Sequence, residues 1–148
     1  MRKITVALAG LGSRGKDTYA KTAKLFPEKM KITAIADIDP EKVKEVAEEY
    51  QIPKEFCFSS AKELLAQEKL ADVMFITTQD RQHVSHAIPA LEKGYDLLLE
   101  KPISPKLEEC RELLKTAQKY DRKVVVCHVL RYTPVSYTHL TLPTTSRV

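Results

Sequence analysis

The chain has 148 residues, enough for one domain with a sizeable hydrophobic core. A net charge of +4, with lysines set among acids as in residues 41–45, predicts a solvated surface and argues against a nucleic-acid-binding patch. Three widely spaced cysteines include no C-x-x-C pair, which argues against a zinc or redox site and fits the cytoplasm. No apolar run is long enough to span a membrane.

Short apolar runs alternate with segments of helical periodicity along the chain. Strands are predicted at residues 4–9, 30–36, 56–58, 72–76, 95–99 and 123–127. Helices are predicted from the first glycine motif to about residue 25, from residue 40 after an Asp39 cap, from residue 61 after a Ser60 cap, and around residues 84–91 and 107–117. This alternation predicts an α/β fold, a doubly wound parallel sheet of the Rossmann type.

A glycine-rich motif, Gly10-Leu11-Gly12-Ser13-Arg14-Gly15, joins the first predicted strand to the first predicted helix. In this context Gly10 permits a tight turn, Gly12 lets a pyrophosphate approach the backbone, and Gly15 lets the helix pack closely on the strand. The helix N-terminus adds free N–H groups and the positive end of its dipole. Arg14 either contacts a phosphate or points to solvent. The motif predicts a dinucleotide-binding site.

An acidic residue ends the second predicted strand. Asp37 lies about twenty residues after the last glycine of the motif, where a carboxylate can bind ribose hydroxyls. A carboxylate there favours NAD and repels the 2′-phosphate of NADP, so NAD is the expected cofactor. Asp39 is better explained as a helix cap. The alternative interpretation of the glycine motif and Asp37 together is a glycine turn with an acidic helix cap that binds no ligand.

A second group of residues follows the fourth and fifth predicted strands. It comprises Thr77 and Thr78, then His83 on the next helix, and Glu100-Lys101-Pro102 after residue 99. With the glycine motif, these residues resemble the Gfo/Idh/MocA oxidoreductases, the glucose–fructose oxidoreductase and inositol dehydrogenase group. The resemblance covers residues 3 to about 134. It implies the first half of a two-domain NAD(P)-dependent dehydrogenase acting on sugars, inositols or similar polyols, with a second α/β domain that often forms homo-oligomers.

The resemblance also implies roles for particular residues. Lys101 would lie beside the nicotinamide and polarise the reacting oxygen, with Glu100 orienting it. Pro102, often preceded by a cis bond in this family, would fix the chain direction. Thr77 and Thr78 would line the cofactor.

Other residues keep two interpretations. The family resemblance implies that Arg131 reaches the active-site cleft; without the resemblance, Arg131 would be interpreted as a surface arginine. Without the other motifs, Lys101 would likewise be interpreted as an exposed lysine at the start of a loop. His83 and His86 are three residues apart on a helix, which favours packing at the helix end or a hydrogen bond on the cofactor side. No third ligand is found, so no metal site is predicted. Gln79 stands where the family often has proline, which affects loop shape and not the fold.

The sequence changes character after Pro134. Residues 135–148 contain no acids and no helical period, and one back-translation of Val135 to Thr144, GTC TCT TAT ACA CAT CTG ACG CTG CCG ACG, resembles a transposon end joined to a sequencing adapter. We therefore expect residues 1–134 to be the dinucleotide-binding domain and residues 135–148 to be a cloning or sequencing artefact. A natural threonine-rich linker or strand is the alternative.

Three functions follow from this interpretation. The first is an enzyme that transfers a hydride between NAD and a carbinol carbon in its full-length form, with no turnover by this chain alone. The second is a non-catalytic dinucleotide-binding sensor or regulatory module, against which Lys101 argues weakly. The third is another two-domain dehydrogenase, such as an amino-acid or bilin-type reductase, which Glu100-Lys101-Pro102 disfavours.

Overall fold

The computed structural model describes residues 2–128 of the chain. They form a six-stranded sheet, parallel throughout, with the strand order β3-β2-β1-β4-β5-β6. The strands are β1 (Ile4–Ala9), β2 (Met30–Ala36), β3 (Cys57–Phe58), β4 (Val73–Ile76), β5 (Asp96–Glu100) and β6 (Val124–Cys127). The predicted α/β, doubly wound Rossmann fold is therefore confirmed, and each strand end lies within one residue of its predicted position.

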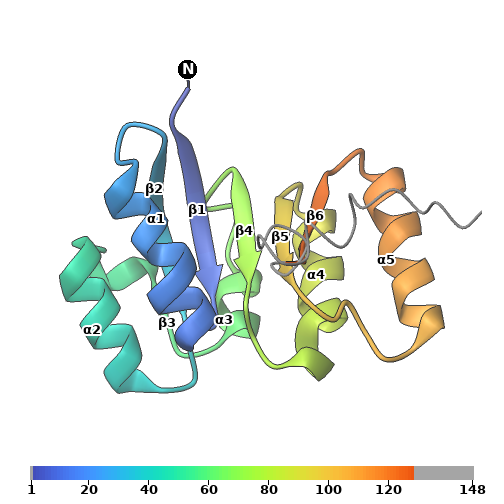
Figure 1. Cartoon of the computed structure of the whole chain (residues 1–148), viewed down its shortest axis with the longest axis horizontal. Coiled ribbons are helices and arrows are strands. Elements are labelled where there is room, and N and C mark those ends of the chain that lie inside the picture. The colour runs from blue at the N-terminus through green and yellow to red at the C-terminus, as the bar shows by residue number, and fades with distance from the viewer. Residues whose placement is uncertain (1, 129–148) are drawn as a thin grey trace, which may run out of the picture.

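Helices occupy the segments between the strands (Figure 1). They are η1 (Ser13–Ala20), α1 (Lys21–Leu25), α2 (Pro40–Tyr50), η2 (Lys54–Phe56), α3 (Ala61–Ala66), η3 (Asp80–Gln82), α4 (His83–Glu92) and α5 (Leu107–Lys119). Asp39 caps α2 by accepting the N–H of Glu41, and Ser60 caps α3 by accepting the N–H of Glu63, as predicted. The first predicted helix reaches Leu25, but its initial eight residues, η1, are π-helical, which the sequence did not predict.

Each face of the sheet has its own hydrophobic cluster. Ala7 and Ala9 of β1 face the cluster that includes α3, α4 and α5, whereas Val6 and Leu8 face the cluster that includes η1, α1 and α2. All four residues are buried. This alternation follows from the period of two along a strand, and a parallel strand covered on both faces needs apolar residues at every position.

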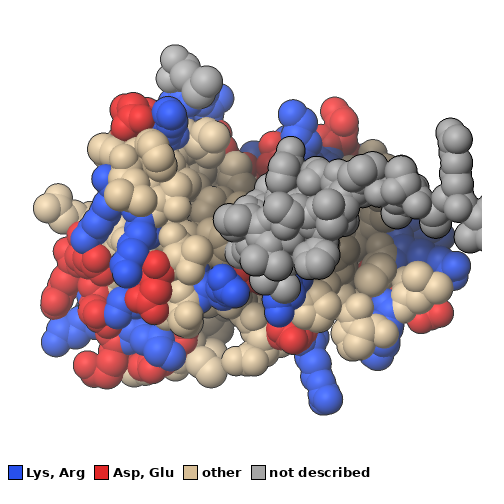
Figure 2. Space-filling view, in the orientation of Figure 1, with Lys and Arg blue, Asp and Glu red and all other residues tan. Residues whose placement is uncertain are grey.

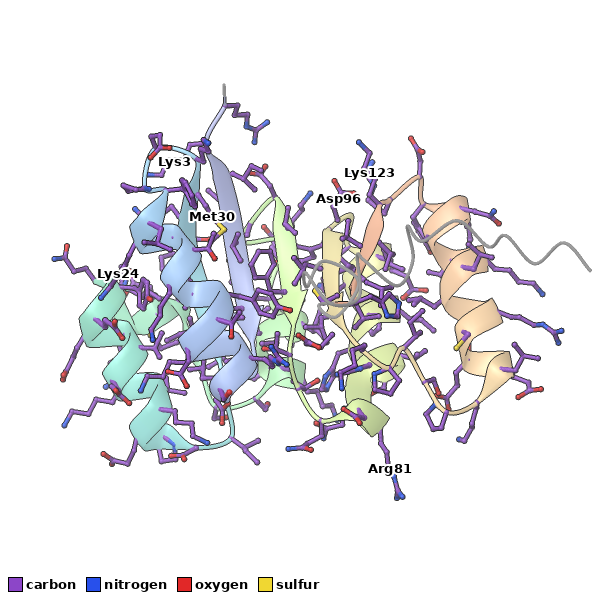
Figure 3. The ribbon with its side chains drawn as sticks, viewed as in Figure 1. Lys3, Lys24, Met30, Arg81, Asp96 and Lys123 are labelled. Carbon is purple, nitrogen blue, oxygen red and sulfur yellow. The ribbon has the colours of Figure 1, made fainter. Side chains whose placement is uncertain are left out.

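The sheet topology sets the place where a ligand can bind. From β1 the chain builds β2 and β3 on one side, and then crosses to build β4, β5 and β6 on the other. The carboxyl ends of β1 and β4, which are adjacent, mark the switch point where open α/β sheets bind their ligands. Figure 3 shows Arg81, which lies just beyond β4, projecting at this end of the molecule, with Lys3, Asp96 and Lys123 at the opposite end.

Charges of both signs are mixed over the helices α1 and α2 (Figure 2). Lys24 of α1 pairs with Glu49 of α2 at 2.5 Å, and Lys16 of η1 pairs with Glu45 of α2. Such exposed pairs contribute little stability, but they keep this face solvated. Between residues 2 and 128, no helix has both the length and the apolar character needed to cross a membrane.

Candidate functional site

A cavity of about 440 Å³ lies at the switch point. Its walls come from the turns that follow β1, β2 and β4, together with the first turn of α3 and parts of α2 and α4. The lining residues are Gly10, Gly12, Ala36, Asp37, Ile38, Lys42, Ser60, Ala61, Lys62, Thr77, Thr78, Gln79, Gln82 and His86. The structure thus gathers Gly10, Gly12, Asp37 and both threonines, which the sequence singled out, around one space.

Close contact accounts for two of the three motif glycines. Gly10 has a φ of +94°, and a Cβ there would lie 2.5 Å from the carbonyl oxygen of Thr77. A Cβ on Gly15 would lie 1.9 Å from the carbonyl oxygen of Gly10 and 2.7 Å from Oγ1 of Thr77. The Thr77 hydroxyl donates to that same Gly10 oxygen at 2.6 Å. The turn after β1, the helix η1 and the loop after β4 therefore meet with no room for side chains.

Gly12 differs from the other two glycines. Its φ of −70° is open to any residue, and a Cβ there would meet no atom within 4 Å. The fold therefore does not require glycine at this position. Gly12 precedes η1 and lines the cavity, and the first turn of η1 carries no acidic residue. An unobstructed helix N-terminus with its positive dipole end uncompensated suits a pyrophosphate.

The carboxylate of Asp37 supports the glycine turn. Oδ2 accepts the N–H of Leu11 at 2.5 Å, and Oδ1 accepts the N–H of Asp39 at 2.9 Å. Leu11, a predicted cofactor contact, uses its N–H in this bond and buries its side chain. Ile38, next to Asp37, is 87% exposed, which is unusual for an isoleucine. Each carboxylate oxygen retains capacity to accept a further hydrogen bond from a ligand.

Glu100 is the last residue of β5, and the turn that it begins with Lys101 and Pro102 does not line the cavity. Glu100 is buried; Oε1 accepts the hydroxyl of Tyr19 at 2.5 Å, and Oε2 accepts the N–H of Lys101 at 3.0 Å. The side chain of Lys101 is exposed, and the Lys101–Pro102 bond is cis. Burial above all, and then Cys127 and Glu100, raise the pKa of Tyr19 well above its ordinary value of 10.0, so its hydroxyl stays protonated.

His83 links this turn to the cavity. Its side chain is fully buried, with Nδ1 2.7 Å from the carbonyl oxygen of Pro102 and Nε2 3.1 Å from the carbonyl oxygen of Thr78. Both ring nitrogens therefore face backbone atoms. His83 thus packs at the start of α4 and does not itself line the cavity.

His86, one turn further along α4, faces the cavity. Its Nδ1 lies 3.1 Å from the hydroxyl of Thr78, and its side chain is partly buried. Burial, followed by the neighbouring His83, lowers the pKa of His86 below its ordinary 6.5. The imidazole is therefore neutral near neutral pH. This leaves His86 able to hydrogen-bond a neutral part of a ligand.

Some predicted site residues lie away from the cavity, and others lie outside residues 2–128, which the structure describes. Ser13 and Arg14 are exposed at the start of η1, and neither lines the cavity. Arg131, together with residues 135–148, lies outside the described residues. Within residues 2–128, no group of three or more His, Cys, Asp or Glu side chains is arranged to hold a metal ion.

The sequence interpretation overlooked Ile38 and Tyr19 in the site region, and it did not foresee the position of His86. Ile38 and His86 line the cavity, and Tyr19 holds Glu100. An apolar residue between two acids at a strand end was an available signal for Ile38. His86 was noticed, although its place on the cavity wall was not foreseen. No local pattern marked Tyr19.

Comparison with known proteins places this geometry in a family. A model described as an oxidoreductase family with an NAD-binding Rossmann fold, Gfo/Idh/MocA, matches residues 4–128. The chain belongs to the Gfo/Idh/MocA oxidoreductase family. This confirms the resemblance seen in the sequence, and NAD is the cofactor of the family. The residues fit it, because Gly12 leaves the helix N-terminus open and Asp37 lies on the same cavity.

Two curated proteins illustrate the similarity of this Gfo/Idh/MocA chain to others. The trans-1,2-dihydrobenzene-1,2-diol dehydrogenase of Xenopus tropicalis is 30% identical over 129 residues, covering 85% of this chain and 38% of that protein. The 2,7-anhydro-N-acetylneuraminate hydratase of Mediterraneibacter gnavus is 25% identical over 132 residues, covering 89% of this chain and 33% of the hydratase. The chain thus spans about a third of the length of the curated relatives it matches.

Solved structures agree with the family. The WlbA dehydrogenase from Chromobacterium violaceum, in complex with NADH and UDP-GlcNAcA, superimposes with a TM-score of 0.81 at 25% identity. The match covers 93% of this chain and 39% of the WlbA chain. Family, fold and cofactor are therefore established for this Gfo/Idh/MocA domain.

Proposed function

We propose that this chain is the NAD-binding part of a dehydrogenase that transfers a hydride between NAD and a carbinol carbon of a sugar, inositol or similar polyol. The observation that carries the proposal is the cavity at the switch point, linked through His83 to the turn that bears Lys101. Two relatives support the substrate class, because one is a diol dehydrogenase and another was solved with UDP-GlcNAcA. We further propose that the chemistry takes place in the cytoplasm, where the three free cysteines stay reduced.

The cavity residues bind and orient the cofactor in this proposal. The N-terminus of η1 binds the pyrophosphate beside Gly12, and Asp37 accepts the ribose hydroxyls while its charge repels a 2′-phosphate. Ser13 and Arg14 contact the outer side of the pyrophosphate, and Thr77 and Thr78 shape the opposite wall. When bound, NAD supplies the hydride acceptor or donor.

The turn after β5 handles the reacting oxygen. The exposed ammonium of Lys101 donates a hydrogen bond to the hydroxyl or carbonyl oxygen of the substrate and stabilises negative charge that develops there. Glu100 orients the lysine. A second α/β domain beyond residue 134 supplies most substrate contacts and the surface for homo-oligomers. The 148-residue chain by itself therefore binds NAD without turning substrate over.

The charge of Asp37 can be tested through the choice between NADH and NADPH, which differ in the 2′-phosphate. The parent chain is expected to bind NADH at least about tenfold more tightly than NADPH, because a carboxylate beside the 2′-phosphate is repulsive. Asp37→Asn removes the charge and keeps one oxygen to accept the N–H of Leu11, but its NH₂ group cannot accept the N–H of Asp39. The variant should bind NADH no more than about threefold more tightly than NADPH. The two dissociation constants are measured by calorimetric titration.

Asp17→Asn is the matched control, because Asp17 is exposed on η1 and does not line the cavity. It should leave the ratio of the two dissociation constants unchanged. Equal affinities for NADH and NADPH in the parent chain would contradict the assignment of Asp37 to the ribose.

Turnover is tested on the longer protein. The source gene, sequenced past the codon for Pro134 from unligated genomic template, should continue into a second domain. The complete protein should then reduce NAD with a polyol or sugar, followed by NADH absorbance across a substrate panel. Lys101→Met should lower kcat by roughly 10²- to 10⁴-fold while NADH affinity changes much less.

Lys106→Met, at an exposed lysine next to α5, is the control and should keep full activity. A gene that encodes Val135 to Val148 and then stops would end the enzyme proposal. A complete protein that binds NADH but oxidises no member of the panel would instead favour the non-catalytic sensor.

A further inference from the structure

A hydrogen bond joins the helix of the glycine motif to the end of β5. Glu100 is 5% exposed, and a buried carboxylate is costly unless it is hydrogen-bonded. One of its oxygens accepts the hydroxyl of Tyr19, which comes from η1, 81 residues away in the chain. The other accepts the N–H of Lys101, the next residue. The carboxylate therefore connects Tyr19 to the backbone of Lys101.

The ring of Tyr19 is held by packing. It meets Phe75 of β4 edge to face, with centroids 5.9 Å apart and an interplanar angle of 77°. Tyr19 also packs against the hydrophobic cluster between the sheet and the helices η1, α1 and α2. The ring position is thus fixed by the core, and the hydroxyl projects from it to Glu100. Loss of the hydroxyl alone would leave this packing in place.

The surroundings keep the hydroxyl a donor. Burial, and then Cys127 and Glu100, raise the pKa of Tyr19 above its ordinary value, so its hydroxyl is protonated at neutral pH. Cys127 of β6 lies beside Glu100 in the ladder between β5 and β6. Burial also raises the pKa of Cys127, which keeps the thiol neutral next to the carboxylate. Among residues 2–128, the side-chain donor to Glu100 is the hydroxyl of Tyr19.

We propose that Tyr19 is a positioning residue for Lys101. Its hydroxyl holds the Glu100 carboxylate, which in turn fixes the N–H of Lys101 and the direction in which the lysine side chain leaves β5. Because Tyr19 and the pyrophosphate site belong to the same helix, η1, one helix sets the distance between the two ends of the bound cofactor. The inference rests on the proposed function, in which Lys101 lies beside the nicotinamide.

Tyr19→Phe tests the proposal in the 148-residue chain. NADH and ADP-ribose share every group except the nicotinamide, so their affinities separate the two ends of the site. The substitution should weaken NADH binding by about five- to tenfold and ADP-ribose binding by less than about twofold. A general disturbance of η1 would instead weaken both ligands alike. Tyr50→Phe is the matched control, a half-buried tyrosine of α2 that should leave both affinities unchanged.

Two further measurements show whether Tyr19 acts through Lys101. In a Lys101→Met background, Tyr19→Phe should have no additional effect on the ratio of NADH to ADP-ribose affinity. In nuclear magnetic resonance spectra of the chain without ligand, Tyr19→Phe should shift the Lys101 amide resonance upfield and speed its hydrogen exchange, because Glu100 is then free to turn away. Tyr50→Phe should move neither.

Several results would overturn the proposal. One is an equal loss of NADH and ADP-ribose affinity in Tyr19→Phe. Another is an additive effect of Tyr19→Phe and Lys101→Met on the affinity ratio. A third is a Lys101 amide resonance that does not shift in Tyr19→Phe. If the parent chain bound neither NADH nor ADP-ribose, the proposed function would fail. The chemical shift and hydrogen exchange of the Lys101 amide would still show whether Tyr19 positions this turn.

Discussion

Gly15→Ala is expected to lower the free energy of unfolding by about 3–5 kcal/mol. The added Cβ would lie 1.9 Å from the carbonyl oxygen of Gly10, a backbone atom at the end of β1. That oxygen also accepts the hydroxyl of Thr77, so it cannot move aside without breaking a buried hydrogen bond. Thermal unfolding followed by circular dichroism should show a fall in Tm of roughly 10–20 °C.

The same substitution should also abolish NADH binding, because η1 can relieve the overlap only by moving away from β1 and carrying its N-terminus out of the cavity. Ser13→Ala, at an exposed position in the same turn, is the control for stability and should keep the parent Tm within about 2 °C. A Gly15→Ala chain with an unchanged Tm would show that the helix and the turn after β1 are not in the close contact described here.

Much of the fold could be predicted because its signals are local. Each central strand is a run of apolar residues bounded by turn residues, as in Ile4–Ala9 ahead of the glycine motif. Helix caps are equally local: Asp39 and Ser60 each bond an N–H two or three residues away. The alternation of strands and helices predicted a doubly wound parallel sheet, whereas the order of its strands came from the structure.

The parts that escaped prediction depend on contacts between distant segments. Glu100 and Tyr19 are 81 residues apart, and nothing in the sequence around either residue records the bond between them. His83 was noticed in the sequence as a candidate cofactor contact. Only the fold shows that its two ring nitrogens face the carbonyl oxygens of Thr78 and Pro102. Periodicity indicated a helix after the motif, yet periodicity cannot distinguish the π-helical turns of η1 from α-helical ones.

The three motif glycines look equivalent in sequence and differ in the structure. At Gly10 and Gly15 protein atoms occupy the space of a side chain, so both glycines stabilise the fold. Gly12 faces open space, so its lack of a side chain has no structural explanation within residues 2–128. This contrast supports the proposal that a ligand approaches the backbone at Gly12, beside a helix N-terminus in the cavity.

Gly12→Ala should therefore separate binding from folding. With a φ of −70° and no atom within 4 Å of the added Cβ, the variant should keep the parent Tm within about 2 °C. The methyl group would occupy the space through which a pyrophosphate approaches the N–H groups of η1. NADH and ADP-ribose should both bind roughly 10- to 100-fold more weakly, a loss of about 1.4–2.7 kcal/mol measured by calorimetric titration.

The contrast with Tyr19→Phe makes this result specific. Gly12→Ala acts at the pyrophosphate, which NADH and ADP-ribose share, so their affinities should fall together, whereas Tyr19→Phe should affect NADH alone. Lys62→Met, on the α3 wall of the same cavity, is the control for general changes in the pocket and should weaken binding far less. Parent-like NADH affinity in a folded Gly12→Ala chain would place the pyrophosphate away from η1 and would remove the central contact of the proposed site.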